Sequence, residues 1–297
     1  MGVLETRELT PEIGTQVLID AEALVAGAHA DELRDLLVER GVIVVRDAHL
    51  NDDQQRAFVA TIGEVRLGTK YEAPTGGMIS ISEIAGTAFW HTDNMYIDLP
   101  PFAETLTAKV VPSRGGQTEF ADTYAAFEAL DPAEQEHLAT LEVVHSMKTA
   151  MDRFFFDPTL EQLEEWMKHK RTQPLVWRHL NGRRSLIIGT TASHVVGMHP
   201  ADSKELLDRL LAHTTQPRFV YRHEWAVGDL VMWDNTGTLH RLRPFDPAEP
   251  RELHRLCAEG VETFRGVRRS GAPDHPTAGE GGPPPTAAPQ AATRRVG

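Results

Sequence analysis

Short runs of β-branched and aromatic residues, cut by glycine, proline and aspartate, constrain the fold of this 297-residue chain more than any other feature. Each run is too short for a stable helix but long enough for a β-strand. Two amphipathic helical patterns lie among them, at 30–41 and 203–215. Many short strands with helices inserted between them predict a mainly β fold, in which a sandwich or barrel core carries flanking helices. The runs lie at 106–111, 117–121, 185–189, 218–225, 229–234 and 252–260.

Local signals predict where some of these elements begin and end. Gly41 stands at the C′ position after the helical pattern 30–41, and the run "VIVVRD" (42–47) that follows is typical of a buried strand. Asp131 and Pro132, with Glu134 after them, have the features of a helix N-terminus: an Asx cap, a proline at the first position and a capping-box acid.

The chain is expected to form one domain over residues 1–266, followed by a disordered tail over 267–297. Residues 271–297 contain 5 Gly, 6 Pro and 6 Ala, and Val296 is their only sizeable apolar side chain. Such a segment cannot bury enough apolar surface to offset its ordering entropy. No internal repeat and no linker-like stretch divides the residues before it.

Charge and cysteine content exclude several classes of function. The net charge of −13 and the pI of about 5.5 argue against a protein that binds nucleic-acid phosphates. Cys257 is the only cysteine, so the chain can form no internal disulfide and no cysteine-based zinc site. No stretch approaches the roughly 18 to 20 apolar residues of a membrane helix, and no signal peptide is recognisable. We expect a cytoplasmic protein that acts on a small molecule.

One imidazole and one carboxylate lie two residues apart in "FWHTDNMYIDLPP" (89–101). If this segment is extended, His91 and Asp93 project from the same face and supply two of the three ligands of a facial triad for Fe(II). The pair alone is weak evidence, because His29 and Asp31 have the same spacing at the start of a helical pattern. A third ligand must come from a distant part of the chain, and His240 follows the strand-like run 229–234.

Two arginines follow His240 on one strand pattern. Arg251 and Arg255 share a face of the run 252–260 and its flank, roughly 13 Å apart at about 3.3 Å per residue. If that face is inward, both guanidinium groups need anions, such as a dicarboxylate cosubstrate and an acidic substrate.

The combined pattern "HTD…GGQT…WDNTGTLHR…R…R" resembles the Fe(II)/2-oxoglutarate-dependent dioxygenases of the taurine dioxygenase and 2,4-dichlorophenoxyacetate dioxygenase family, over roughly residues 8–262. The resemblance implies a double-stranded β-helix, a cupin-like jelly roll, that uses Fe(II), 2-oxoglutarate and O₂. It also implies roles for six residues: His91, Asp93 and His240 as iron ligands and catalytic residues, and Thr118, Arg251 and Arg255 as cofactor-binding residues. Arg255 matches the second arginine of the family, which in the taurine enzyme receives the substrate's acid group.

The same resemblance bears on the substrate. The segment 62–74 lacks the histidine with which the taurine enzyme contacts a sulfonate, whereas 183–198 is similar to the branch that degrades aryloxyalkanoates. We therefore expect a hydrophobic substrate that bears a carboxylate. The retained Asp93 argues against halogenation. Residues near the metal motif are candidates for the substrate pocket, although each can equally be a core residue: Tyr71, Trp90, Asn94, Met95 and Tyr96. Phe154, Phe155 and Phe156 are expected to pack a helix start, and Arg241 and His254 to face solvent.

Several alternatives remain at this stage. A biosynthetic enzyme of the same family would tailor an antibiotic-type terpenoid or another natural product by desaturation, epoxidation or ring oxidation. A cupin-like metal isomerase or hydrolase would use the same ligands without 2-oxoglutarate, and a binding protein would use the fold without catalysis. The family is often dimeric or tetrameric, so a homo-oligomer is an expectation without a fixed number of subunits.

Overall fold

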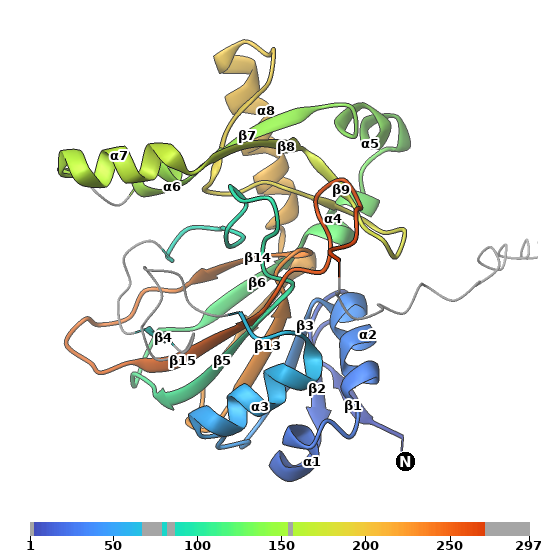
Figure 1. Cartoon of the computed structure of the whole chain (residues 1–297), viewed down its shortest axis with the longest axis vertical. Coiled ribbons are helices and arrows are strands. Elements are labelled where there is room, and N and C mark those ends of the chain that lie inside the picture. Colours follow the sequence, from blue (N-terminus) through green and yellow to red (C-terminus); the bar gives the residue numbers. More distant parts are fainter. Residues whose placement is uncertain (1–2, 67–78, 82–86, 154–156, 271–297) are drawn as a thin grey trace, which may run out of the picture.

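A seven-stranded sheet is the largest element of the computed structural model, which describes residues 3–66, 79–81, 87–153 and 157–270 (Figure 1). All of its pairings are antiparallel except the pairing of β2 with β3. In spatial order the strands are β1 (Glu5–Glu8), β2 (Thr15–Leu18), β3 (Val42–Val45), β13 (Leu230–Asp234), β5 (Ala103–Val110), β15 (Glu252–Ala258) and β4 (Ile79–Ile81).

A three-stranded sheet faces the large one and closes the core. It consists of β12 (Val220–His223), β6 (Thr118–Asp122) and β14 (Thr238–Leu242), all antiparallel. Side chains from both sheets meet in one buried cluster, in which the rings of Phe120 and Trp233 lie 5.4 Å apart and Leu106 and Leu253 pack beside them. The result is a jelly-roll core of two sheets, as the sequence predicted.

Three helices cover the outer face of the large sheet: α1 (Ala21–Val25), α2 (Ala30–Arg40) and α3 (Asp52–Ile62) (Figure 1). Leu33, Leu37 and Phe58 from these helices form a second buried cluster with Met232 and Leu256 of the sheet. Because both faces of β13 and β15 are covered, these strands are held firmly in place. Trp233 of β13 and Leu253 and Arg255 of β15 line the candidate site.

The remaining elements form a second layer that joins the small sheet through α4 and α8. They include α8 (Pro200–Thr214), whose Leu210 is fully buried in a third cluster with Leu239 of β14. The others are α4 (Thr123–Glu128), α5 (Pro132–Leu138), β7 (Glu142–Ser146), α6 (Met147–Met151), α7 (Leu160–Lys168), β8 (Lys170–Pro174), β9 (Val176–Arg178), β10 (Arg184–Leu186), β11 (Ala192–Val195) and the 3₁₀ turn η1 (Pro217–Phe219). Among the described residues, no helix is long and apolar enough to cross a membrane.

Local sequence signals predicted the bounds of some of these elements. Helix α2 ends where Gly41 adopts a positive φ of 69°, and α5 begins at Pro132 with the Asp131 side chain accepting a hydrogen bond from the amide of Ala133. Near the predicted end of the domain at residue 266, the amide of Arg269 donates to the carbonyl of Val261, and the division between domain and tail stays a prediction. The predictions for Tyr71, for 154–156 and for most of the tail lie outside the described residues.

Candidate metal centre

Backbone pairing brings His91 and His240 together from segments far apart in the sequence. The amide of His91 donates to the carbonyl of His240 at 3.0 Å, and the reverse hydrogen bond is 2.8 Å long. Only this one bridge is strand-like, so the supposed extended conformation of 90–95 holds around His91 and ends before Asp93. A turn begins at Asp93 and Asn94 has a φ of 60°, and the Asn235 side chain holds the turn by accepting from the Asp93 amide at 3.0 Å.

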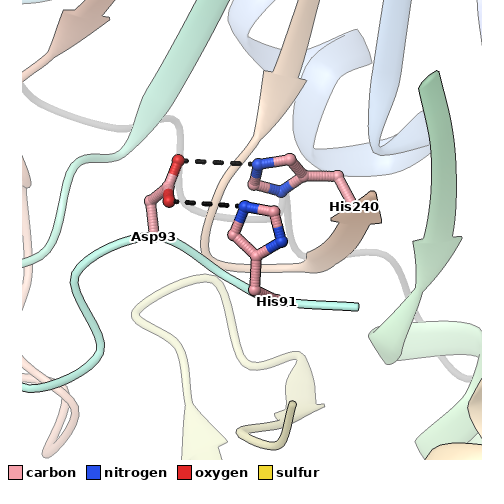
Figure 2. Close-up of side chains that lie close together, drawn as sticks. All are labelled: His91, Asp93 and His240. Carbon is pink, nitrogen blue, oxygen red and sulfur yellow. Dashed lines mark ion pairs between the residues drawn. The ribbon is translucent and has the colours of Figure 1, made fainter. Parts of the chain in front are cut away.

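The three predicted ligands converge on one point (Figure 2). His91 Nε2 lies 3.7 Å from Asp93 Oδ1, and His240 Nε2 lies 3.5 Å from Asp93 Oδ2. One potential donor atom from each side chain lies within 4.8 Å of the others. His91 Nδ1 donates to the carbonyl of Phe89 at 2.8 Å, which leaves Nε2 unprotonated and directed at the shared point.

The pKa values of His91 and Asp93 favour the protonation states that bind a cation. Burial, reinforced by His240, lowers the pKa of His91 to about 4, so its imidazole is neutral near pH 7. Burial opposes ionisation of Asp93, but the Arg255 guanidinium and His240 outweigh it and hold the pKa of the carboxyl well below its usual range. Two imidazoles and one carboxylate are the donor set of the facial triad that binds Fe(II) and leaves coordination positions open. The residues therefore fit the metal that the resemblance implies.

The second His-x-Asp pair forms no such cluster. His29 pairs with Glu32, and Asp31 pairs with Arg34. Within the described ranges, the set of His91, Asp93 and His240 is the only group of three or more potential ligands with this convergence.

Arg251 is a buried cation that lies in the same cavity as the three ligands. Its exposed fraction is 6%, and desolvation lowers its pKa to about 10. Its only hydrogen bond to a described residue is a long one of 3.5 Å to the carbonyl of Gly116, and no described carboxylate lies within ion-pair distance. Thr118 lines the same cavity, and its hydroxyl accepts from Trp225 Nε1 at 3.0 Å. A buried guanidinium without a counter-ion is suited to bind an anion.

Arg255 also lines the cavity, but it already has anionic partners. Its Nε and Nη2 donate to the two carboxylate oxygens of Glu104, both at 2.6 Å, and Nη2 also donates to Asp93 Oδ2 at 2.9 Å. Burial opposes the charge of Arg255, but Asp93 and Glu104 raise its pKa well above the usual value. Arg255 therefore faces the site as predicted, but as part of an internal ion pair instead of as a free anion receptor.

The residues predicted for the substrate pocket are dispersed. Trp90 lines a second cavity beside the metal centre, where the Arg241 guanidinium stacks 4.5 Å from the centre of its ring. Met95 packs instead in a buried cluster with Trp177 and Phe264, because the turn at Asn94 directs it into the core. Tyr96 lies beside His169, with the rings 5.9 Å apart, and neither Asn94 nor Tyr96 is among the residues that line these two cavities.

Two residues of the site were missed. Arg241 was expected to face solvent, yet it lines both cavities and its Nε donates to the buried Glu119 at 2.6 Å. Glu104 lies in β5, where its parity with Leu106 points it into the core. A charged residue at an inward position of a strand indicates a buried polar contact, and the spacing of Glu104 and Leu106 in the sequence contains this signal. His254 was also expected to be solvated, and it is half-buried and paired with Asp52 and Glu252.

Comparison with known proteins decides the family. The family model described as "Taurine catabolism dioxygenase TauD, TfdA family" matches residues 5–257. The chain belongs to this family. It is 35% identical over 263 residues to the alpha-ketoglutarate-dependent 2,4-dichlorophenoxyacetate dioxygenase of Cupriavidus pinatubonensis, a match that covers 80% of this chain and 91% of the relative.

Two further similarities describe the breadth of the TauD/TfdA family. The chain is 37% identical over 181 residues to pentalenolactone F synthase of Streptomyces arenae, covering 57% of this chain and 60% of the relative. The crystal structure of AAD-2 in complex with Mn(II) and N-oxalylglycine superposes with a TM-score of 0.79 at 31% identity, covering 89% of this chain and all of that one.

Membership of the TauD/TfdA family makes this protein an oxidoreductase that depends on Fe(II), 2-oxoglutarate and O₂ and acts on a small molecule. Neither a metal-dependent isomerase or hydrolase nor a non-catalytic binding protein is consistent with these relatives.

Proposed function

We propose that this dioxygenase oxidises a C–H bond of a hydrophobic small molecule and converts 2-oxoglutarate and O₂ to succinate and CO₂ in each turnover. The observation that carries the proposal is Arg251, a buried guanidinium without a described carboxylate partner in the same cavity as the three ligands. A dicarboxylate can neutralise Arg251 at one end and reach the metal centre with the other. Neither an isomerase nor a hydrolase needs such a clamp.

The chain's own residues have separable roles in this reaction. His91, Asp93 and His240 would hold Fe(II), which when bound supplies the redox chemistry that activates O₂. Arg251 would fix the distal carboxylate of 2-oxoglutarate by paired hydrogen bonds, and Thr118 would support it from β6. The ring of Trp233 and the side chains of Leu106 and Leu253 form apolar walls that limit water in the cavity.

Electrons and atoms balance with these reactants alone. Decarboxylation of 2-oxoglutarate supplies two electrons and accepts one oxygen atom of O₂ into succinate. The substrate supplies the other two electrons. It either gains the second oxygen atom, as in hydroxylation and epoxidation, or loses two hydrogen atoms to form water, as in desaturation and some ring closures.

Two substrate classes follow from the relatives. The similarity to 2,4-dichlorophenoxyacetate dioxygenases supports a hydrophobic carboxylic acid, as the sequence suggested with Arg255 as its anion receptor. The similarity to pentalenolactone F synthase supports a biosynthetic enzyme that tailors a natural product. The pairing of Arg255 with Glu104 favours the second class, because it leaves no free guanidinium at the place where an acid was expected.

A cytoplasmic location and a homo-oligomeric state are also part of the proposal. The single cysteine, Cys257, is buried and fits a reducing compartment. Family members often form oligomers, and size-exclusion chromatography with light scattering measures the state directly.

Coupled turnover tests the proposed function. The purified enzyme with Fe(II), 2-oxoglutarate and O₂ is screened against neutral terpenoids, lactones and aryloxy acids, and succinate and oxidised product are quantified together. We expect at least one compound to raise succinate formation well above the rate without substrate, with one product molecule for each succinate. Asp93→Ala should reduce succinate to background. No succinate from the wild-type enzyme under any condition would contradict the proposal.

A further inference from the structure

Glu104 is a charged residue at the centre of the large sheet. It lies in β5, where it is in register with Trp233 of β13 on one side and with Cys257 of β15 on the other. Its exposed fraction is 0%, so water does not solvate its carboxylate. A carboxylate at such a position is costly unless a cation satisfies it. Glu104 and Arg255 therefore each require the other as a counter-ion.

The Glu104 carboxylate occupies the recognition edge of Arg255. An arginine binds a carboxylate best through two parallel N–H groups, and the Nε and Nη2 edge of Arg255 makes this bidentate contact with Glu104 at 2.6 Å for both bonds. The same Nη2 also donates to Asp93 Oδ2 at 2.9 Å. A substrate carboxylate would therefore have to displace an internal one to obtain the same geometry.

The local charge opposes a second anion. One guanidinium is shared by two carboxyl groups, Glu104 and Asp93, so its positive charge is already matched within the protein. An acid brought to Arg255 would compete with these two groups and lie beside them in a largely desolvated cavity, where like charges repel strongly. An uncharged acceptor avoids this repulsion. The Nη1 group of Arg255 makes no hydrogen bond to a described residue, and the side chain is 16% exposed where it lines the cavity.

We propose that Glu104 determines substrate specificity because it occupies the edge of Arg255 that would otherwise bind an anion. The substrate group that contacts this arginine is then an uncharged oxygen acceptor such as an ester, lactone, ketone or ether. The inference rests on the proposed function and narrows its substrate class. Arg255 then acts as a single hydrogen-bond donor through Nη1 and as a positioning residue for Asp93 through Nη2.

A matched pair of ligands tests this directly. Phenoxyacetic acid and its methyl ester share one hydrophobic body and differ in charge, and their dissociation constants are measured anaerobically with Fe(II) and 2-oxoglutarate bound, by tryptophan fluorescence. For the wild-type enzyme we expect the ester to bind at least about tenfold more tightly than the acid, or the acid not to bind at all. In Glu104→Ala we expect the affinity for the acid to increase about 10- to 100-fold, because a charged hydrogen bond to arginine contributes on that order.

Controls separate specificity from damage to the fold. Glu104→Gln keeps the size of the side chain and removes its charge, so it should gain affinity for the acid even if the alanine variant folds poorly. Glu142→Ala removes an exposed glutamate that pairs with Arg265, and it should leave the dissociation constants of both ligands unchanged. The dissociation constant for 2-oxoglutarate reports whether each variant keeps the site intact.

The outcomes are distinguishable from failure of the proposed function. Slow formation of succinate without substrate by the wild-type enzyme tests the dioxygenase activity alone. If that activity is present, a wild-type preference for the acid overturns the role of Glu104. Failure of both Glu104 variants to gain affinity for the acid overturns it as well.

Discussion

At the scale of single residues, the site depends on which atoms are left without partners. His91 Nδ1 is committed to a backbone carbonyl, so its Nε2 is the free donor, and Asp93 is kept ionised by Arg255. Arg251 presents the opposite case of a buried cation that lacks a described counter-ion. Comparison of the two arginines shows why residue type alone is insufficient. Arg251 and Arg255 share a face and a cavity, yet only Arg251 is free to bind a dicarboxylate.

Replacement of Arg251 tests its role. Arg251→Gln should raise the dissociation constant for 2-oxoglutarate about 10- to 100-fold, because charged hydrogen bonds contribute roughly 1.5 to 3 kcal/mol. Metal affinity should be unchanged, since Arg251 does not contact the three ligands. Isothermal titration with each component separates the two. Arg218→Gln, at an exposed arginine beside Phe219, is the matched control. An unchanged affinity for 2-oxoglutarate in Arg251→Gln would exclude the assignment.

At the scale of elements, the sequence predicted strands and helix ends better than loops. The stop at Gly41 and the start at Asp131 were readable because the determining contacts are local. The start of α3 carries the same kind of local signal, since Asn51 and Gln54 form a capping box. The segment that carries His91 and Asp93 is extended only in part, because it turns at Asp93. Its turn depends on Asn235, 142 residues away from Asp93, and no local pattern reveals such a contact.

Gly189 shows how a neighbouring loop positions the ligand segment. It has a φ of 104°, and a Cβ at this position would lie 2.9 Å from the carbonyl oxygen of Trp90 and 3.2 Å from His91 Cα. Gly189→Ala should therefore displace the backbone of His91 and weaken metal binding about tenfold or more, with a smaller loss of stability than a core truncation. Gly182→Ala is the control, because its φ is also positive, at 84°, but its Cβ would meet no atom within 4 Å. Equal metal affinities in the two variants would refute this role.

At the scale of the whole molecule, the fold and the ligand set were predictable and the charge balance of the cavity was not. The short strands predicted a sandwich or barrel core with flanking helices, the resemblance to the family implied a jelly roll, and the family motifs predicted the ligands and Arg251. Glu104 reaches Arg255 from the neighbouring strand of the large sheet, and Glu119 pairs with Arg241 across neighbouring strands of the small sheet, so their roles appear only once the strand order is known. Met95, adjacent to the motif in sequence, lies in the core because the chain turns at Asn94.

Buried histidines predict how the stability of the whole fold depends on pH. Burial lowers the pKa of His145, which is 0% exposed, to about 3, against an ordinary value of 6.5. Between these pH values the unfolded chain binds a proton that the folded chain does not, so stability falls as the pH falls below 6.5. His91 and His223, whose pKa values burial also lowers, act in the same direction.

The raised pKa values of Glu104, about 7, and of Asp122, about 6, act in the opposite direction between pH 7 and pH 5. The contribution of His145 is therefore measured by comparing the urea midpoints of the metal-free wild-type protein at the two pH values with those of a variant. His145→Asn keeps a polar group near Thr191 but cannot titrate in this range, so its midpoint should fall less between the two pH values, even if it is less stable at both. Parallel decreases in the two proteins would show that His145 does not contribute to the pH dependence.

The central claim is that the cavity holds Fe(II) and 2-oxoglutarate together, and anaerobic titration measures it most directly. Addition of 2-oxoglutarate to the enzyme with Fe(II) should produce a weak visible charge-transfer band that saturates at one equivalent. His91→Ala should abolish the band, and Arg251→Gln should shift its appearance to higher 2-oxoglutarate concentrations. Absence of the band in the wild-type enzyme, with 2-oxoglutarate binding unaffected by His91→Ala, would contradict the account.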